Sequence, residues 1–326
     1  MKTCHVCSKD DCDFETRCHH SFHYNCLKTY FDRYHEALCP HCSGNISLNL
    51  KVERILHEPS KLPESLNTLD TEELNLILKF LVEKGDSKSM ELVVSLGADI
   101  HFDDEYVLRH ACEKGFFDIV KYAWELGSDL DTKVGDPLIT SAMNGHFEIV
   151  KYLIENGALV HDYSICWSAG NGHFEIVKYL VEHGADIHTH NEFALRLSAM
   201  YGYLDLVKYL IELGANVHEE NEESLRRSAE FGHLEVVKYL IEKGADVNVD
   251  NDYAIIHSAR NGHFDVIKFL AENGANIRAH DDEVLLVSAE EGHLETVKYL
   301  IEKLMQSDTD ISVLCSKVLC CSAYNH

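Results

Sequence analysis

The chain has 326 residues, enough for two domains or for one small module attached to an extended array. Its 55 acidic and 29 basic side chains leave a net charge of −26, which repels phosphate backbones and makes nucleic acid a poor partner. Every apolar run is interrupted by a charge well before twenty residues, so no membrane-spanning helix is predicted. Because Met1–Thr3 leads into Cys4 without an apolar stretch, we expect an intracellular, cytoplasmic protein whose cysteines are thiols or thiolates.

The N-terminal segment is rich in potential metal ligands, since seven of the twelve cysteines fall within the first 42 residues. Two C-x2-C pairs enclose a cluster of cysteine and histidine, in the order C-x2-C-x10-C-x-H-x2-H-x2-C-x12-C-x2-C. The eight candidate ligands are Cys4, Cys7, Cys18, His20, His23, Cys26, Cys39 and Cys42. Cysteine pairs at this spacing reach one tetrahedral zinc, so eight ligands predict two zinc ions with four ligands each.

This order of ligands resembles a RING finger of the RING-H2 type, over residues 1–45. The resemblance implies a small cross-brace domain in which the ligand pairs interleave. One zinc is then held by Cys4, Cys7, His23 and Cys26, and the other by Cys18, His20, Cys39 and Cys42. His19 lies beside His20, and an exchange of these two ligands stays open. A segment this short buries too little apolar area to fold alone, so the two structural zinc ions supply much of its folding free energy.

A nucleic-acid zinc finger is the other interpretation of the cysteines, but it needs one zinc, a C-x2–4-C…H-x3–5-H order and a basic helix, and none is present. RING fingers that act as ubiquitin ligases bind a ubiquitin-conjugating enzyme, and the resemblance implies Val6, Tyr30 and Pro40 as contacts. Tyr30 stands where the family often has tryptophan, and packing against neighbouring side chains explains it equally well. Ser43 replaces the basic residue that many active members carry, so weak or partner-dependent ligase activity stays open.

Residues 46–73 contain Pro59 and Pro63 and are predicted to be a linker. From residue 74 onward a glycine recurs every 30 residues, with one interval of 27, and a second glycine usually follows twelve residues later. The first glycines are Gly85, Gly115, Gly145, Gly172, Gly202, Gly232, Gly262 and Gly292. A fixed period in this range predicts a solenoid of stacked units.

Each unit is predicted to contain two helices joined at the first glycine. In "GHFEIVKYLIENGA" (145–158), the apolar side chains Ile149, Val150, Leu153 and Ile154 lie at helical spacing and predict a buried stripe. Gly157 is a suitable residue to end that helix. A shorter helix precedes each first glycine, and its small Ser198-Ala199 pair allows close approach to the neighbouring helix.

The segment "ESLRRSAEFGHLEVVKYLIEKGADVN" (223–248) resembles the ankyrin repeat. The resemblance implies a mostly α solenoid over residues 74–304, with about eight repeats, no catalytic chemistry, and a surface of turns and first helices that binds proteins. Since the period is about three residues shorter than the family's 33, we expect a truncated turn between repeats. Such short units are similar to the ankyrin arrays of large DNA viruses of amoebae, which implies action in a host cell. Residues 305–326 resemble a half repeat that caps the array.

Comparison of the repeats predicts which side chains contact a partner. Large side chains at variable positions of the central repeats are the candidates: Trp167, Met200, Tyr201, Arg227 and Phe231. Packing between adjacent first helices, or drift on a tolerant surface, explains these positions equally well. Acid clusters such as Glu219-Glu220 either favour a basic partner or solvate the turns. The histidines after the first glycines alternate with Phe116 and Tyr203, which indicates a structural ladder rather than metal binding.

Two functions follow from these expectations. The first is a RING-type ubiquitin ligase that positions a ubiquitin-charged conjugating enzyme while the array recruits an unidentified protein substrate. The second is a non-catalytic adaptor, in which the zinc module only docks or dimerises. A metal-dependent hydrolase is disfavoured, because the sequence has no open metal site or carboxylate–histidine constellation.

Overall fold

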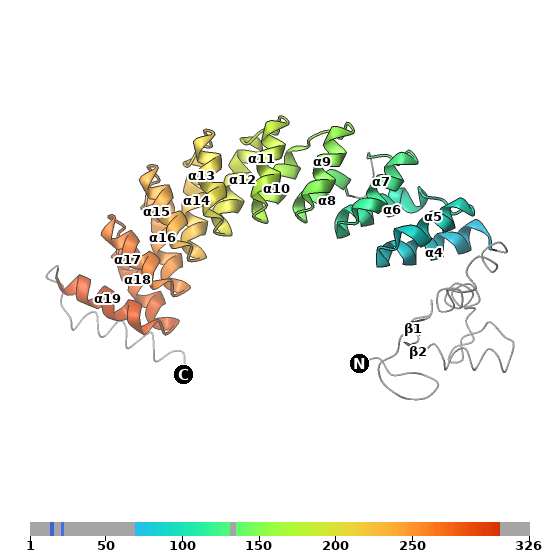
Figure 1. Ribbon diagram of the computed structural model, residues 1–326. Coiled ribbons are helices and arrows are strands. Elements are labelled where there is room, and N and C mark those ends of the chain that lie inside the picture. The colour runs from blue at the N-terminus through green and yellow to red at the C-terminus, as the bar shows by residue number, and fades with distance from the viewer. Residues whose placement is uncertain (1–13, 16–20, 23–68, 131–134, 307–326) are drawn as a thin grey trace. The chain divides into compact units, whose positions relative to one another are not determined.

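The computed structural model describes residues 14–15, 21–22, 69–130 and 135–306. The chain divides into two compact units, Met1–Val134 and Gly135–His326. In the first unit, β1 (Phe14–Glu15) and β2 (Ser21–Phe22) pair antiparallel, with Phe14 opposite Phe22. The remaining described residues form mainly α-helices (Figure 1), as the repeat pattern predicts.

The described helices form eight pairs, each with a first helix, a tight turn at a glycine and a second helix. The first helices are α4 (Thr71–Lys84) and α6 (Phe102–Lys114) in the first unit, and α8 (Pro137–Met143), α10 (Asp162–Gly170), α12 (Thr189–Met200), α14 (Glu219–Glu230), α16 (Val249–Arg260) and α18 (Ala279–Glu290) in the second. The second helices are α5 (Ser87–Ser95) and α7 (Phe117–Glu125), then α9 (Phe147–Glu155), α11 (Phe174–Glu182), α13 (Leu204–Glu212), α15 (Leu234–Glu242), α17 (Phe264–Glu272) and α19 (Leu294–Met305).

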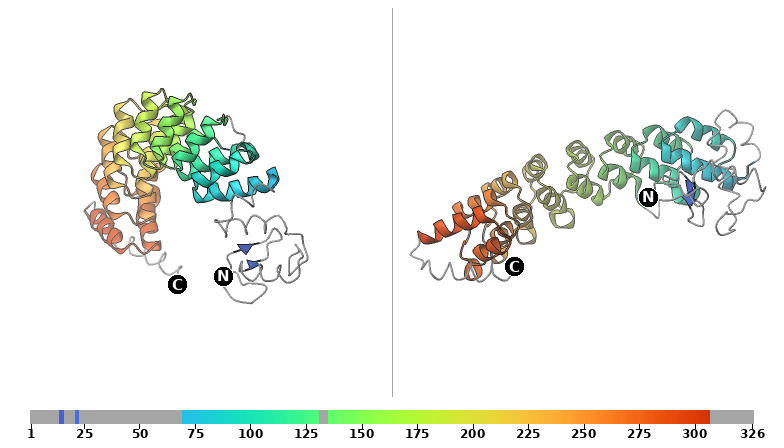
Figure 2. Two further views of the ribbon diagram at one scale, coloured as in Figure 1. Left: turned by 45° about the vertical axis from the view of Figure 1, so that its right-hand side comes forward. Right: turned by 90° about the horizontal axis from the view of Figure 1, so that it is seen from below.

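The second unit has two layers, one of first helices and one of second helices. Consecutive first helices pack side by side from α8 to α18, and consecutive second helices pack likewise from α9 to α19 (Figure 2). The core lies between the layers. On α9, Ile149, Val150 and Leu153 are buried as predicted, whereas Ile154 is only half-buried. Each residue turns about 100° around the helix axis, which puts Ile154 at the edge of the buried stripe.

The small residues of the first helices are buried at the contacts between repeats. Ser198 and Ala199 are fully buried, as the predicted close approach requires. The hydroxyl of Ser258 donates to the carbonyl oxygen of Ala254 at 2.5 Å, and it also lies 3.1 Å from the carbonyl oxygen of Ala229 in the preceding repeat. The hydroxyl therefore satisfies its own hydrogen-bonding capacity inside the core.

The histidines that follow the first glycines form the expected structural ladder. In the four repeats with His173, His233, His263 and His293, Nε2 bonds a carbonyl oxygen of the preceding repeat: His173 that of Met143 (3.0 Å), His233 that of Met200, His263 that of Glu230 and His293 that of Arg260 (2.9 Å each). The same rings cover the glycine turn of the preceding repeat. These imidazoles hold adjacent repeats in register.

A left-handed triplet of residues begins most of the first helices and replaces a longer turn. The triplets are Asp103–Glu105, His190–Glu192, Glu220–Glu222, Asp250–Asp252 and His280–Asp282, all with φ between 47° and 74°. Asp, Asn and His tolerate this conformation better than most residues. α10 lacks the triplet and has nine residues where α12 has twelve, which accounts for the single interval of 27 residues.

The two ends of the predicted array are described only in part. α4 begins at Thr71, because Asp70 and Glu73 form a capping box in which each side chain bonds the other's backbone N–H. Most of the predicted linker, residues 46–68, lies outside the described residues. The predicted capping half repeat does too, apart from Met305 and Gln306, and it stays a prediction.

Candidate functional site

The predicted zinc module lies almost wholly outside the described residues. Its eight ligands, and also Val6, Tyr30 and Pro40, belong to the part of the chain that is not described, so the two-zinc domain stays a prediction. Within residues 69–130 and 135–306, no three His, Cys, Asp or Glu side chains converge as metal ligands would. Nor is any described helix long and apolar enough to cross a membrane.

The five predicted partner contacts all lie on one surface of the second unit. We call this surface the first-helix layer; it comprises α8, α10, α12, α14, α16 and α18 and the residue that ends each helix. Trp167 lies on α10, and Tyr201 and Phe231 directly follow α12 and α14; their exposed fractions are 39%, 51% and 46%. Met200 and Arg227 are half-buried on the same helices.

Four ring-bearing side chains connect α10 with α12 and form what we call the aromatic end. Tyr163 stacks on His190 with ring centroids 4.4 Å apart, and Trp167 meets Phe193 edge to face at 6.1 Å. Tyr163 and Trp167 remain exposed. Because each of these exposed rings packs on a neighbouring helix, it loses little conformational entropy when a partner covers it.

Packing between first helices explains some of the variable positions, but not all. Leu197 and Val287 occupy the position that corresponds to Trp167, and both are buried. A Cβ atom on Gly170 would lie 3.0 Å from a methyl carbon of Leu197, so the absence of a side chain at Gly170 allows α12 to approach α10. The position five residues before the first glycine is therefore a core position in some repeats and a surface position in others.

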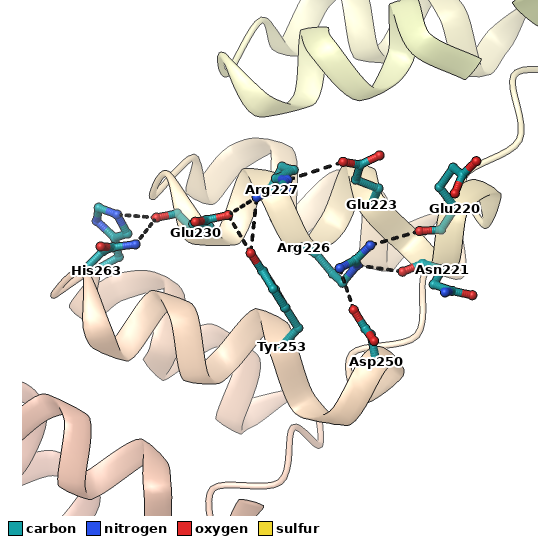
Figure 3. A network of polar contacts seen from close by, with 10 residues as sticks. Glu220, Asn221, Glu223, Arg226, Arg227, Glu230, Asp250, Tyr253 and His263 are labelled. Carbon is teal, nitrogen blue, oxygen red and sulfur yellow. Dashed lines mark hydrogen bonds and ion pairs between the residues drawn. The ribbon is translucent and has the colours of Figure 1, made fainter. Parts of the chain in front are cut away.

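Arg227 belongs to a network of polar contacts between α14 and α16 (Figure 3). One guanidinium nitrogen, Nη1, lies 2.8 Å from Glu230 Oε2 and 3.2 Å from the hydroxyl of Tyr253, and Nε lies 3.4 Å from Glu223 Oε1. The Tyr253 hydroxyl donates to Glu230 at 3.0 Å. Arg227 therefore does not present a free cation to a partner.

The contacts in this network shift the pKa values of Arg227, Glu230 and Tyr253. Hydrogen bonding to Glu230 raises the pKa of Arg227. Burial alone raises the pKa of Glu230, but the hydrogen bonds from Arg227 and Tyr253 outweigh it and leave this pKa below its ordinary value. Burial and the bond to Glu230 raise the pKa of Tyr253. All three groups keep their ordinary charge states near neutral pH, so the network is held by a charged hydrogen bond.

Arg226 stabilises the left-handed triplet that begins its own helix. Its Nε donates to the carbonyl oxygen of Asn221 at 2.9 Å and its Nη2 to that of Glu220 at 3.1 Å, while Nη1 pairs with Asp250 at 2.6 Å (Figure 3). In the first unit, Arg109 binds the carbonyl oxygens of two triplet residues in the same way. An arginine at this position is therefore structural.

The third residue of each triplet is an acid, and in three of the five triplets it is buried: Glu192, Glu222 and Asp282. Glu192 is 5% exposed, and its Oε1 lies 2.7 Å from His188 Nδ1 and accepts the backbone N–H of Asn216 at 3.1 Å. Glu222 bonds His218 in the same way and accepts the backbone N–H of Asp246. These two acidic residues therefore stabilise the array and are not available to a partner.

The charge of the first-helix layer is strongly negative. Its six helices contain 13 Asp and Glu residues, four arginines and no lysine. Glu192, Glu222 and Asp282 are buried, and most of the others reach solvent. The layer therefore attracts positive charge and repels anions.

Tyr163 and Phe193 of the aromatic end are not among the predicted contacts, although variation between repeats marks their position. In the five repeats from α10 to α18, the position nine residues before the first glycine is Tyr163, Phe193, Glu223, Tyr253 and Glu283, and each of these side chains is at least partly exposed. This position varies as strongly as the positions five residues and one residue before the first glycine, which contain Trp167 and Tyr201. Comparison of the repeats therefore identifies Tyr163 and Phe193 from sequence alone.

Cys166 is a packing residue and not a reactive thiol. Cys166, next to Trp167 on α10, is fully buried, and burial raises the pKa of its thiol to about 12. A thiol with that pKa is not a nucleophile near neutral pH. Its role is packing between the two layers.

Comparison with known families agrees with this architecture. A sequence model of ankyrin repeats in three copies matches residues 77–164, 160–221 and 225–313. No curated protein matches the chain. Because the three matched segments cover more than half of its residues, the chain belongs to the ankyrin-repeat family.

Proposed function

We propose that this protein is a RING-type ubiquitin ligase whose ankyrin array recruits the substrate. Ankyrin repeats are modules for protein–protein interaction, which supports the recruiting part of the proposal. The ligase part rests on one observation, the order and spacing of the eight ligands from Cys4 to Cys42. The proposal implies action in the cytoplasm, and in a host cell for a viral source, which the similarity of the short repeats to viral arrays supports.

The donor set fits zinc. Six cysteine sulfurs and two imidazole nitrogens are the ligand types that structural zinc sites use. Four protein ligands for each ion leave no open position, so these ions stabilise the module and do not activate water. Catalysis then consists of holding the charged conjugating enzyme close to the substrate in a reactive orientation. Val6, Tyr30 and Pro40 would contact that enzyme.

A non-catalytic adaptor is the second candidate, and two residues favour it. Ser43 stands where many active RING fingers have a basic residue, and Tyr30 stands where they often have tryptophan. In an adaptor, the zinc module docks or dimerises while the first-helix layer binds the partner. Both functions use the array in the same way and differ only in the N-terminal segment.

Self-ubiquitination in a reconstituted reaction separates the two functions. The full chain, first shown to contain two zinc ions, is incubated with a panel of ubiquitin-conjugating enzymes. Cys39→Ser serves as the zinc-site control and Val6→Asp as the contact-site variant. A ligase forms ubiquitin chains that Cys39→Ser abolishes and Val6→Asp strongly reduces. No chains with any conjugating enzyme, from protein with its full zinc content, would contradict the ligase and support the adaptor.

A further inference from the structure

We infer that the first-helix layer binds an extended, lysine- and arginine-rich segment of the partner protein, with an apolar side chain of that segment on the aromatic end. The inference rests on the proposed function, because it assumes that the array recruits a protein. It specifies the chemistry of the recruited segment.

The first argument is that all cations of the layer are already paired. The pairs and their shortest N–O distances are Arg196–Glu223 (2.6 Å), Arg226–Asp250 (2.6 Å), Arg227–Glu230 (2.8 Å) and Arg260–Glu283 (3.6 Å). These pairs neutralise the positive charge of the six helices but leave an excess of nine carboxylates, six of which are not buried. A segment that brings its own cations complements this surface.

The second argument is that the two layers differ in their cations. The second helices of the same unit contain twelve Asp and Glu residues and seven lysines, and none of these lysines is buried. Among side chains that are not buried, the excess of carboxylates is similar, six on the first helices and five on the second helices. A basic segment therefore meets no lysine on the first helices, whereas lysines on every second helix would repel it.

The third argument concerns the carboxylates that a partner would cover. Asp162 lies exposed beside the aromatic end, Glu220 is exposed on α14, and Glu291 is exposed where α18 ends. A neutral or acidic segment laid over them would remove water from charged groups without compensation. Lysine or arginine on the segment compensates for that loss through ion pairs that are partly desolvated.

The aromatic end supplies the anchor. Trp167 and Tyr163 lie one helical turn apart on α10 and are both exposed. Tryptophan and tyrosine contribute more than most residues to binding at interfaces, and their ring faces accept apolar groups as well as cations. One end of the segment is therefore fixed by apolar contact, and the rest by charge.

The length of the segment follows from the geometry of the layer. Neighbouring helices pack about 8–10 Å apart, so the path from α10 across α12, α14 and α16 to α18 is roughly 40 Å long. An extended chain covers about 3.3 Å per residue, so roughly 12 residues cross these helices. This length is that of a short linear segment rather than a whole domain surface.

A selection from random peptides tests the inference. A phage-displayed library of peptides about 12 residues long is selected on the full chain, and the enriched peptides are synthesised with a fluorescein label. Their dissociation constants are measured by fluorescence anisotropy at low and high salt. We expect peptides rich in Lys and Arg with an apolar residue near one end, and we expect binding to weaken as salt is raised.

Matched variants locate the binding surface. Trp167→Ala should weaken binding at least tenfold, whereas Leu294→Ala, which shortens an exposed side chain on the second-helix layer, should leave it unchanged. Asp162→Asn with Glu291→Gln should weaken binding severalfold at low salt. Glu148→Gln with Glu175→Gln removes the same charge from α9 and α11 and should have little effect. Circular dichroism confirms that all variants are folded.

The outcomes separate this inference from the proposed function. Enriched peptides that are neutral or acidic, and that lose binding with Trp167→Ala, would overturn the basic segment but leave recruitment by the layer intact. Equal losses with Trp167→Ala and Leu294→Ala, or no enrichment at all, would overturn the inference outright. The self-ubiquitination reaction does not depend on the partner, so it reports on the ligase in either case.

Discussion

The imidazole of His233 occupies the space that a side chain on Gly202 would need. An ideal Cβ atom on Gly202 would lie 2.5 Å from His233 Nδ1, while Nε2 of the same ring bonds the carbonyl oxygen of Met200 at 2.9 Å. Gly202 also has a φ of +80°, which disfavours any L side chain. Glycine is therefore required here both by the backbone and by the neighbouring repeat.

Gly202→Ala should destabilise the array more than Gly214→Ala. Both positions have a positive φ, so each substitution costs about 1–2 kcal/mol of backbone strain. Nothing lies within 4 Å of a Cβ at Gly214, whereas Gly202→Ala must also displace the ring of His233. We expect Gly202→Ala to lose about 1–2 kcal/mol more, measured by urea unfolding. His233→Ala in the Gly202→Ala background should recover part of the loss, and equal losses at both glycines would contradict the explanation.

Arg226→Lys should be more destabilising than Arg227→Lys. The guanidinium of Arg226 donates to two carbonyl oxygens of a left-handed triplet and pairs with Asp250, and an ammonium group cannot reproduce this fork. We expect a loss of about 1–2 kcal/mol for Arg226→Lys. For Arg227→Lys, whose side chain is 36% exposed, we expect less than about 1 kcal/mol. Urea unfolding of both variants is the measurement, and the reverse order would show that Arg226 does not support the triplet.

His188 should stabilise the array at low pH and lose this effect as pH rises. The hydrogen bond to Glu192, with the nearby charges of Glu192 and Asp186, raises the pKa of His188 above its ordinary 6.5. Its stabilisation is therefore complete below pH 6.5 and disappears as pH rises through the raised pKa. We expect the stability difference between wild type and His188→Gln to shrink steadily from mildly acidic to mildly alkaline buffer. A difference that does not change with pH would mean that protonation of His188 is not involved.

His257 should show the opposite dependence. Burial against Tyr253, whose ring lies 3.8 Å away centroid to centroid, lowers the pKa of His257 below 6.5, although Glu230 acts in the other direction. The folded state then favours the neutral imidazole, so its contribution is present above pH 6.5 and is lost as pH falls from there through the lowered pKa. His257→Gln should remove this loss of stability in acid. NMR titration of the two histidines checks the directions independently, and shifts of the same sign would refute this pair of predictions.

Removal of zinc should abolish the function of the N-terminal module and leave the array folded. We expect two zinc ions per chain by elemental analysis, and a chelator should remove both. Within the described helices no group of metal ligands exists, so their far-ultraviolet circular dichroism and unfolding transition should not change. Cys39→Ser should behave like chelated protein. Loss of the array's helical signal on chelation would show that the two parts depend on each other for folding.

The repeat architecture and several exposed residues of the first-helix layer can be predicted from the sequence alone. Glycines at a period of 30 predict the helix pairs, and the apolar stripe from Ile149 to Ile154 predicts their buried face, apart from the half-buried Ile154. Variation between repeats identified Trp167, Tyr201 and Phe231, which are exposed on the first-helix layer. These features depend on local periodicity, which is directly visible in a sequence.

Which variable and charged residues reach the surface depends on contacts between repeats. Leu197 and Trp167 share a position, yet only Leu197 is buried. Glu222 belongs to an acidic turn, yet its carboxylate bonds the backbone of the next repeat. Arg227 is a predicted contact, and the structure pairs its guanidinium with Glu230. The reason is physical: local periodicity sets the helices, but burial and pairing depend on groups from adjacent repeats, about 23 to 33 residues away, that only folding brings into contact.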